Sequence, residues 1–190
     1  ISAPKTTLDV VSYETYFDDY AYFKQLAAQY GASYYDFNLA KPELFENKEP
    51  DYHKDFTHMN AAGGHAFSLS MAKFLAMLDA GQDVESLFET PSEYLVAVNY
   101  ITNVYLTPEV HPDKILLLAG SYHGPSVQAE YEFWVKAPGE SEYSRVSAYS
   151  TRSWTEYAAA EHGTYQFRVN ARIVGSSADF ERYYECSVDF

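Results

Sequence analysis

Asp55 and His58 are the residues whose types and spacing best suit catalysis. They stand three positions apart in residues 51–64, a stretch that leads directly into a predicted helix starting near Asn60. A carboxylate beside an imidazole fixes the imidazole tautomer, and it stabilises the imidazolium that forms when the ring takes a proton from a nucleophile. The pair therefore fits the orienting and base positions of a hydrolase triad.

Two other interpretations of these residues stay open. His58 could be a hydrogen-bonded loop histidine, with Asp55 capping the approach to the helix, because D-x-x-H spacing often occurs by chance. His53, Asp55 and His58 could instead bind zinc, although no supporting cysteine or Glu-containing helix motif is present. We expect no metal, no cofactor and a structural position for His65, which lies on the predicted helix.

The neighbouring segments predict the elements that would position the pair. Apolar and aromatic residues recur at spacings of three and four over residues 13–30, which predicts a helix ending before Gly31. The short aromatic run of residues 32–38 predicts a strand. A second helix is predicted from an N-cap at Asn60 to Gly81. Its expected apolar stripe consists of Phe67, Met71, Phe74, Leu75 and Leu78.

From about Ser92 the pattern changes to short strands. Apolar or alternating runs occupy residues 114–118, 127–135, 164–169 and 182–188, and turn-forming stretches separate them. This pattern of short strands separated by turns predicts a β-sandwich of short antiparallel strands. We therefore expect an α/β domain over residues 1–90 and an all-β domain over residues 91–190, with the boundary near residues 89–93.

Composition excludes several classes of protein. The 190 residues carry 13 Lys and Arg against 27 Asp and Glu, a net charge of -14, which disfavours nucleic acid and anionic lipid as partners. No apolar run approaches the ~20 residues needed to cross a bilayer. A hydrophobic content of 47% indicates a folded protein, and the single Cys186 cannot form an internal disulfide.

The first half resembles the C-terminal part of an SGNH (GDSL-like) hydrolase. The resemblance rests on residues 55–58 (DFTH) as the D-x-x-H block, continued by residues 60–63 (NAAG) as N-x-x-G at the start of the last helix. Residues 34–38 (YYDFN) are similar to the strand preceding that block, and residues 1–4 to the end of an inner strand. The similarity covers roughly residues 1 to 80 and implies a three-layer α/β fold, present here in part. It also implies ester hydrolysis or acyl transfer by a serine nucleophile, with His58 as base and Asp55 as its orienter.

The nucleophile itself is not apparent in the sequence. No G-D-S or G-x-S-x-G motif occurs, and neither Ser2 nor Ser121 sits in a strand-to-helix nucleophile turn. In the family, the serine and the oxyanion-hole residues precede the strand that residues 1–4 resemble. We therefore expect a catalytically incomplete C-terminal fragment of a secreted or envelope-associated bacterial enzyme, whose substrate is a cell-wall or other O-acylated polysaccharide. The aromatic faces of the two predicted helices must be buried. Either further strands of the sheet or self-association through the incomplete α/β surface would bury them.

The second half resembles bacterial immunoglobulin-like or fibronectin-like domains in residues 127–138 and 163–172. Trp134 and Trp154 are expected to be core or edge anchors, and a sugar-binding platform is the alternative.

Asp36 and Asn38 follow the predicted strand. They are expected to satisfy loop backbone groups, although strand ends in α/β folds also border active sites.

A non-catalytic binding protein is the rival interpretation of the whole chain. In it, the α/β part is a degenerate scaffold and the β-sandwich binds a glycan or another protein. In a third interpretation, the β-sandwich only spaces or rigidifies the parent protein.

Overall fold

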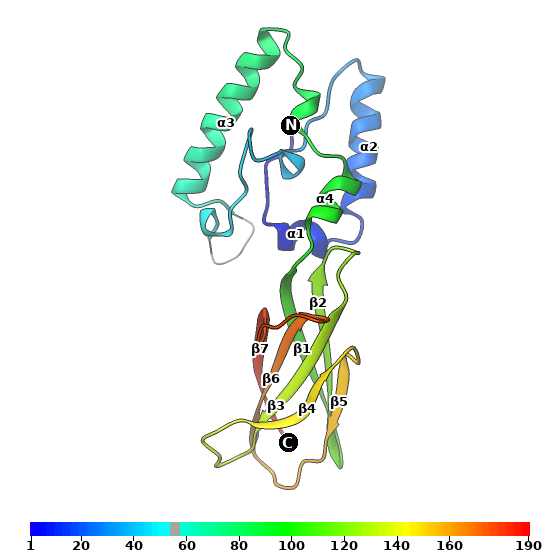
Figure 1. Ribbon diagram of the computed structural model, residues 1–190, viewed down its shortest axis with the longest axis vertical. Helices are drawn as coiled ribbons and strands as arrows, with labels where there is room; N and C mark the ends of the chain where they lie inside the picture. The colour runs from blue at the N-terminus through cyan, green and yellow to red at the C-terminus, as the bar shows by residue number, and fades with distance from the viewer. Residues whose placement is uncertain (54–57) are drawn as a thin grey trace. The chain divides into compact units, whose positions relative to one another are not determined.

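The protein has a mixed α/β structure that divides into two compact units, Ile1–Val98 and Asn99–Phe190 (Figure 1). The computed structural model describes residues 1–53 and 58–190. Within these residues the helices lie in the first unit and the strands of both sheets in the second, and we call them the α unit and the β unit. The residues expected at the domain boundary lead into α4 (Pro91–Ala97). Tyr94 of α4 and the following Val98 pack into the core of the α unit, so this unit extends to Val98.

The helices of the α unit begin and end where local capping chemistry dictates. They are α1 (Thr7–Ser12), α2 (Tyr16–Gln29), α3 (Ala61–Asp79) and α4. The two long helices predicted from periodicity are confirmed as α2 and α3. Asn60 caps α3 by accepting hydrogen bonds from the backbone amides of Ala62 and Gly63. Gly31 and Gly81, with φ of 70° and 67°, adopt the left-handed conformation that ends a helix.

The strand predicted for residues 32–38 is wrong. Among the described residues, this segment forms one isolated parallel bridge, between Ser2 and Asp36, and residues 37–39 turn into the 3-10 helix η1 (Phe37–Leu39). The Asp36 carboxylate accepts a hydrogen bond from the Asn38 amide, which draws the backbone out of the extended conformation. On the opposite segment, Pro4 has no amide hydrogen with which to continue the pairing.

Edge-to-face aromatic contacts form much of the core of the α unit. Phe37 and Phe74 are fully buried, and their ring centroids lie 5.4 Å apart with an interplanar angle of 82°. Tyr35 and Phe88 pack against the same rings. The 3-10 turns η2 (Glu49–Asp51) and η3 (Glu85–Leu87) lie in the loops on either side of α3.

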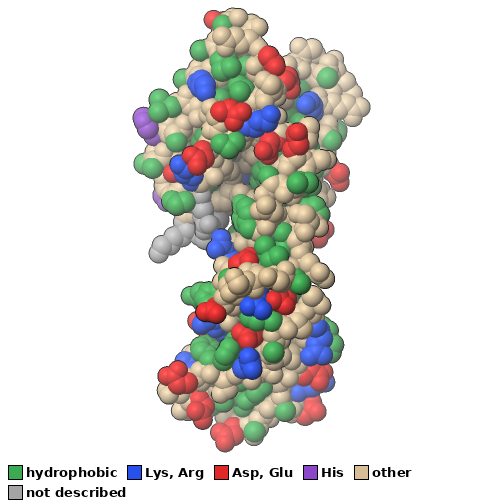
Figure 2. Space-filling view, in the orientation of Figure 1, with side chains coloured by type: hydrophobic (Ala, Val, Ile, Leu, Met, Phe, Trp, Pro, Cys, Tyr) green, Lys and Arg blue, Asp and Glu red, His purple; other side chains and the backbone are tan. Residues whose placement is uncertain are grey.

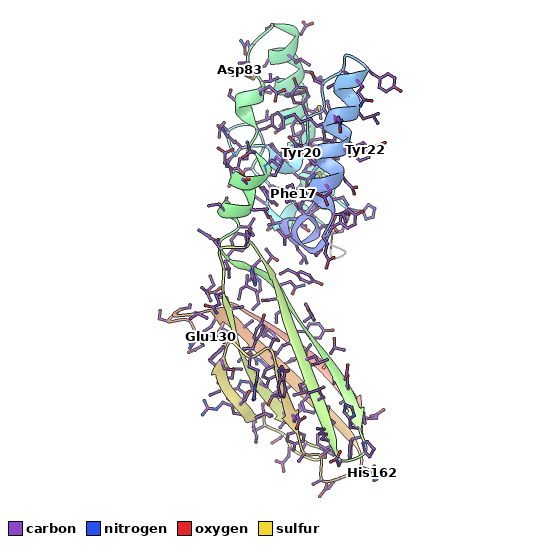
Figure 3. All side chains as sticks on the ribbon, turned by 90° about the vertical axis from the view of Figure 1, so that its right-hand side faces the viewer. Phe17, Tyr20, Tyr22, Asp83, Glu130 and His162 are labelled. Carbon is purple, nitrogen blue, oxygen red and sulfur yellow. The ribbon has the colours of Figure 1, made fainter. Side chains whose placement is uncertain are left out.

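The outer faces of the two long helices remain largely uncovered in this unit. No residue of α2 is buried, although Phe17 packs near Tyr94 and Tyr20 near Tyr34. Phe17 and Tyr20 are labelled on α2 in Figure 3. In the stripe predicted for α3, Phe74 is buried and Phe67 and Met71 are partly buried. Leu75 and Leu78 are instead 48% and 43% exposed, so the expected stripe is only half correct. Among the described residues, the core cluster of the unit packs on the side of α3 that carries Phe67, Met71 and Phe74. Figure 2 shows hydrophobic side chains reaching the visible surface of the unit.

The β unit consists of two antiparallel sheets that share one core. Its strands are β1 (Ile101–His111), β2 (Lys114–His123), β3 (Ala129–Lys136), β4 (Ser144–Ser150), β5 (Trp154–Tyr157), β6 (Thr164–Ile173) and β7 (Arg182–Asp189). The sheet orders are β1-β2-β5 and β4-β3-β6-β7. Side chains of both sheets, among them Leu117, Phe133 and Phe167, are buried together. The four predicted strands are confirmed as β2, β3, β6 and β7, and their antiparallel pairing is confirmed as well.

Candidate functional site

His58 lies in the loop that enters α3, and backbone pairing holds its position. Tyr52 and Met59 form an isolated antiparallel bridge, and the His53 amide donates a hydrogen bond to the His58 carbonyl over 2.8 Å. The His58 side chain is exposed. Asp55, the predicted orienting carboxylate, lies outside the described residues, and so therefore does the complete zinc set of His53, Asp55 and His58.

The residues that follow His58 fix the entry of the chain into α3. The Asn60 side chain accepts from the amides of Ala62 and Gly63 and donates to the Pro50 carbonyl over 2.7 Å. Gly63 packs so closely on Asp51 that a Cβ at this position would lie 2.8 Å from Asp51 Cβ and closer still to the Asp51 carbonyl oxygen. The N-x-x-G part of the block is therefore explained by packing between the helix and the preceding turn.

Asp36 and Asn38 hold the segment around the parallel bridge. Asp36 is 3% exposed, and its carboxylate accepts from the Tyr16 hydroxyl over 2.6 Å and from the Asn38 side-chain amide over 2.7 Å. Asn38 Oδ1 accepts from the Lys5 amide over 2.6 Å. Burial, followed by the hydrogen bond to Asp36, raises the pKa of Tyr16. These contacts match the expected structural role, in which both side chains satisfy hydrogen-bonding groups of the loop backbone.

A hollow of about 240 Å³ borders Asp36 within the α unit. Tyr20, Lys24, Tyr34 and Glu89 contribute to its lining, and His58 does not. Burial raises the pKa of both Tyr34 and Glu89. Because the Asp36 oxygens already accept three hydrogen bonds, the hollow offers no available carboxylate from that residue.

The two tryptophans lie on different sheets of the β unit. Trp154, on β5, is 42% exposed, and the Arg152 guanidinium lies 4.6 Å from its ring centroid. Trp134, on β3, is partly buried and lines a second hollow, of about 400 Å³. The two rings therefore do not form a common platform, and Trp134 is the one that lines this hollow.

The polar residues that surround Trp134 were not predicted from the sequence. Glu132 and Asn170, which are paired across β3 and β6, are buried in this hollow, and Arg168 opposes Trp134 in the same register. The alternation in residues 127–135 and 164–169 was the available signal, because it assigns these side chains to the face opposite the core. Their adjacency depends on strand register, which the sequence pattern does not specify.

Comparisons with protein-family models and with curated proteins find no match. Within residues 1–53 and 58–190, no group of three or more His, Cys, Asp or Glu side chains is placed to hold a metal ion. None of the helices in this described part has the length and hydrophobicity required to cross a bilayer.

Proposed function

We propose that the α unit is the C-terminal part of an SGNH-like hydrolase domain and that the β unit is an immunoglobulin-like sandwich. In this proposal the protein belongs to a bacterial serine esterase or acyltransferase of the cell envelope or the extracellular space. Its substrate would be an O-acylated polysaccharide. His58 would act as general base and Asp55 would orient its ring.

The observation that carries the proposal is the setting of His58. Its backbone is clamped by the pairing of residues 52 and 53 with residues 58 and 59, while its side chain is exposed at the entry to α3. A general base must be held in place and must also reach the proton it abstracts. A clamped backbone with an accessible imidazole meets both requirements.

Two features of the α unit support a larger parent domain. The bridge between Ser2 and Asp36 is parallel, the pairing used in the sheets of α/β folds. Exposed apolar side chains on α2 and α3, such as Phe23 and Leu75, are suited to cover further sheet. The nucleophilic serine would come from polypeptide other than residues 1–190.

The chemistry follows from the roles of the pair. His58 would take the proton of the serine hydroxyl as its oxygen attacks the ester carbonyl, forming a tetrahedral oxyanion. Collapse of this intermediate expels the sugar alkoxide, which receives the proton from the imidazolium, and leaves an acyl-enzyme. Water, or a second hydroxyl in an acyltransferase, then attacks the acyl group with His58 again serving as base.

The test uses the natural coding region with any segment that precedes Ile1. Wild type, His58→Ala and His53→Ala are assayed with p-nitrophenyl acetate. We expect His58→Ala to lower turnover by ~10²-fold or more, the range for loss of a general base. His53→Ala is the matched control, because His53 is also exposed and the proposal assigns no catalytic role to its side chain. Equal turnover in wild type and His58→Ala, or no turnover in wild type, overturns the proposal.

A further inference from the structure

The outer face of the sheet β4-β3-β6-β7 carries a built polar hollow, and we propose that it binds a neutral saccharide. This inference concerns the β unit alone and does not depend on the proposed hydrolase. The hollow measures about 400 Å³, at the lower end of the ~300–1,000 Å³ of small-molecule sites. A volume of this size suits a monosaccharide or a short oligosaccharide end.

The floor of the hollow is polar and buried, which is unusual for the outer face of a sheet. Glu132 and Asn170 are 7% and 6% exposed, and they oppose each other across β3 and β6. Glu132 Oε2 accepts from Trp134 Nε1 over 2.8 Å, which fixes the orientation of the indole ring. The other two donors to this carboxylate are distant, Asn170 Nδ2 at 3.4 Å from Oε2 and Arg145 at 3.5 Å from Oε1, so Oε1 keeps acceptor capacity for a ligand.

The loop between β6 and β7, residues 174–181, is held over this face. The Arg172 guanidinium lies 3.9 Å from the centroid of the Tyr149 ring and donates to the Ala178 carbonyl over 2.9 Å. It also donates to Glu130 over 2.7 Å (Glu130 is labelled in Figure 3). Tyr149 donates to the Asp179 carbonyl, and burial raises its pKa to about 12, so the phenol remains a donor. The hollow is therefore formed in advance of any ligand.

Aromatic and cationic groups complete the wall. Arg168 packs between Phe180 and Tyr183, at 5.0 and 4.4 Å from their ring centroids, and donates to Asn170 Oδ1 over 2.8 Å. These contacts hold the guanidinium beside the Trp134 ring, its partner in the strand register.

The charges in the lining select for a neutral ligand. The acidic groups are Glu132 and Asp179, and the basic groups are Arg168 and Arg172, so the formal charges cancel. A strongly anionic or cationic ligand would gain no net attraction here.

The combination of groups fits a sugar better than an apolar ligand. A carboxylate acceptor, an amide and a guanidinium donor can pair with neighbouring hydroxyls, each of which donates and accepts. An indole face meanwhile covers the apolar C–H surface of a pyranose ring.

The test is a binding titration with the full 190-residue chain. The Trp154→Phe variant has Trp134 as its sole tryptophan and reports directly on the hollow. Glucose, galactose, N-acetylglucosamine and their β-linked disaccharides are the neutral probes, and glucuronic acid and glucosamine are the charged ones. We expect at least one neutral probe to change the fluorescence saturably, and calorimetry on the wild-type chain to confirm the binding.

Three variants connect the binding to the hollow. Glu132→Gln and Trp134→Phe should each weaken the neutral probe about tenfold or more, the effect of losing a buried polar or stacking contact. Glu132 is buried, so its replacement could disturb folding. Phe180 lies at the rim of the hollow and is 38% exposed, so Phe180→Ala is the variant least able to do so. Phe180→Ala should weaken binding as well. Binding of no neutral probe, binding of charged probes only, or unchanged affinity in all three folded variants overturns the proposal.

Discussion

Replacing Gly63 by alanine should destabilise the α unit, and the size of the effect follows from the packing of α3. The new Cβ would lie 2.8 Å from Asp51 Cβ, 3.0 Å from the Asp51 carbonyl carbon and closer still to the carbonyl oxygen. That oxygen accepts the Asn60 amide over 2.9 Å, so it cannot move without breaking a hydrogen bond at the start of the helix. Overpacking of this kind costs ~1–3 kcal/mol, and the greater helix propensity of alanine offsets at most ~1 kcal/mol. A net loss of about 1 kcal/mol is expected when the offset is complete, rising to about 2 kcal/mol without it.

Gly64 provides the control one residue later in the same helix. A Cβ at Gly64 meets nothing within 4 Å, so Gly64→Ala should stabilise α3 by up to ~1 kcal/mol. Urea unfolding followed by ellipticity at 222 nm reports mainly on the α unit, since the described helices lie there. The midpoint should fall for Gly63→Ala and rise for Gly64→Ala. If the two variants have the same stability within ~0.5 kcal/mol, the packing argument for Gly63 is refuted.

Two further predictions concern titratable groups. Burial and the Asp36 hydrogen bond raise the pKa of Tyr16, so the folded state keeps a proton that the unfolded state loses above pH ~10. The free energy of unfolding should therefore decrease as the pH rises through that value, and less steeply in Tyr16→Phe; identical slopes would contradict this. Burial likewise raises the pKa of Cys186, so iodoacetamide should alkylate the native protein at pH 8 more slowly than the urea-unfolded protein. Equal alkylation rates in the two states would show that the thiol is accessible.

Local sequence signals predicted the helices and strands whose formation depends on residues close together in the sequence. Periodicity and capping residues such as Asn60 and Gly31 predicted α2 and α3, and alternation predicted four strands of the β unit. The same reasoning failed for residues 32–38, where β-prone aromatics suggested a strand. There the Asp36 carboxylate accepts the hydrogen bond of the Asn38 amide, in competition with strand pairing. The pairing that the described residues show is a single bridge to Ser2.

The polar hollow could not be predicted because it depends on contacts between distant residues. Glu132 and Asn170 meet across 38 positions of sequence, and Arg172 reaches Tyr149 on another strand. Composition indicated an aromatic-rich chain, but only the strand register brings Trp134, the acidic floor and the arginines together. Trp154 instead pairs with Leu118 in the other sheet, another contact between residues far apart in the sequence.

The residues that resemble the SGNH block differ in whether their contacts in the fold account for their identity. Asn60 caps α3 and Gly63 allows the helix to approach Asp51, so a purely structural protein would retain both. The carbonyl of His58 contributes to the loop pairing, but any residue can supply a carbonyl at that position. The His58 side chain is exposed at this position, which is the accessibility that a general base requires. In the proposal, His58→Ala lowers turnover by ~10²-fold or more, and the 222 nm unfolding midpoint of the same variant shows whether the loss arises from the chemistry or from the fold.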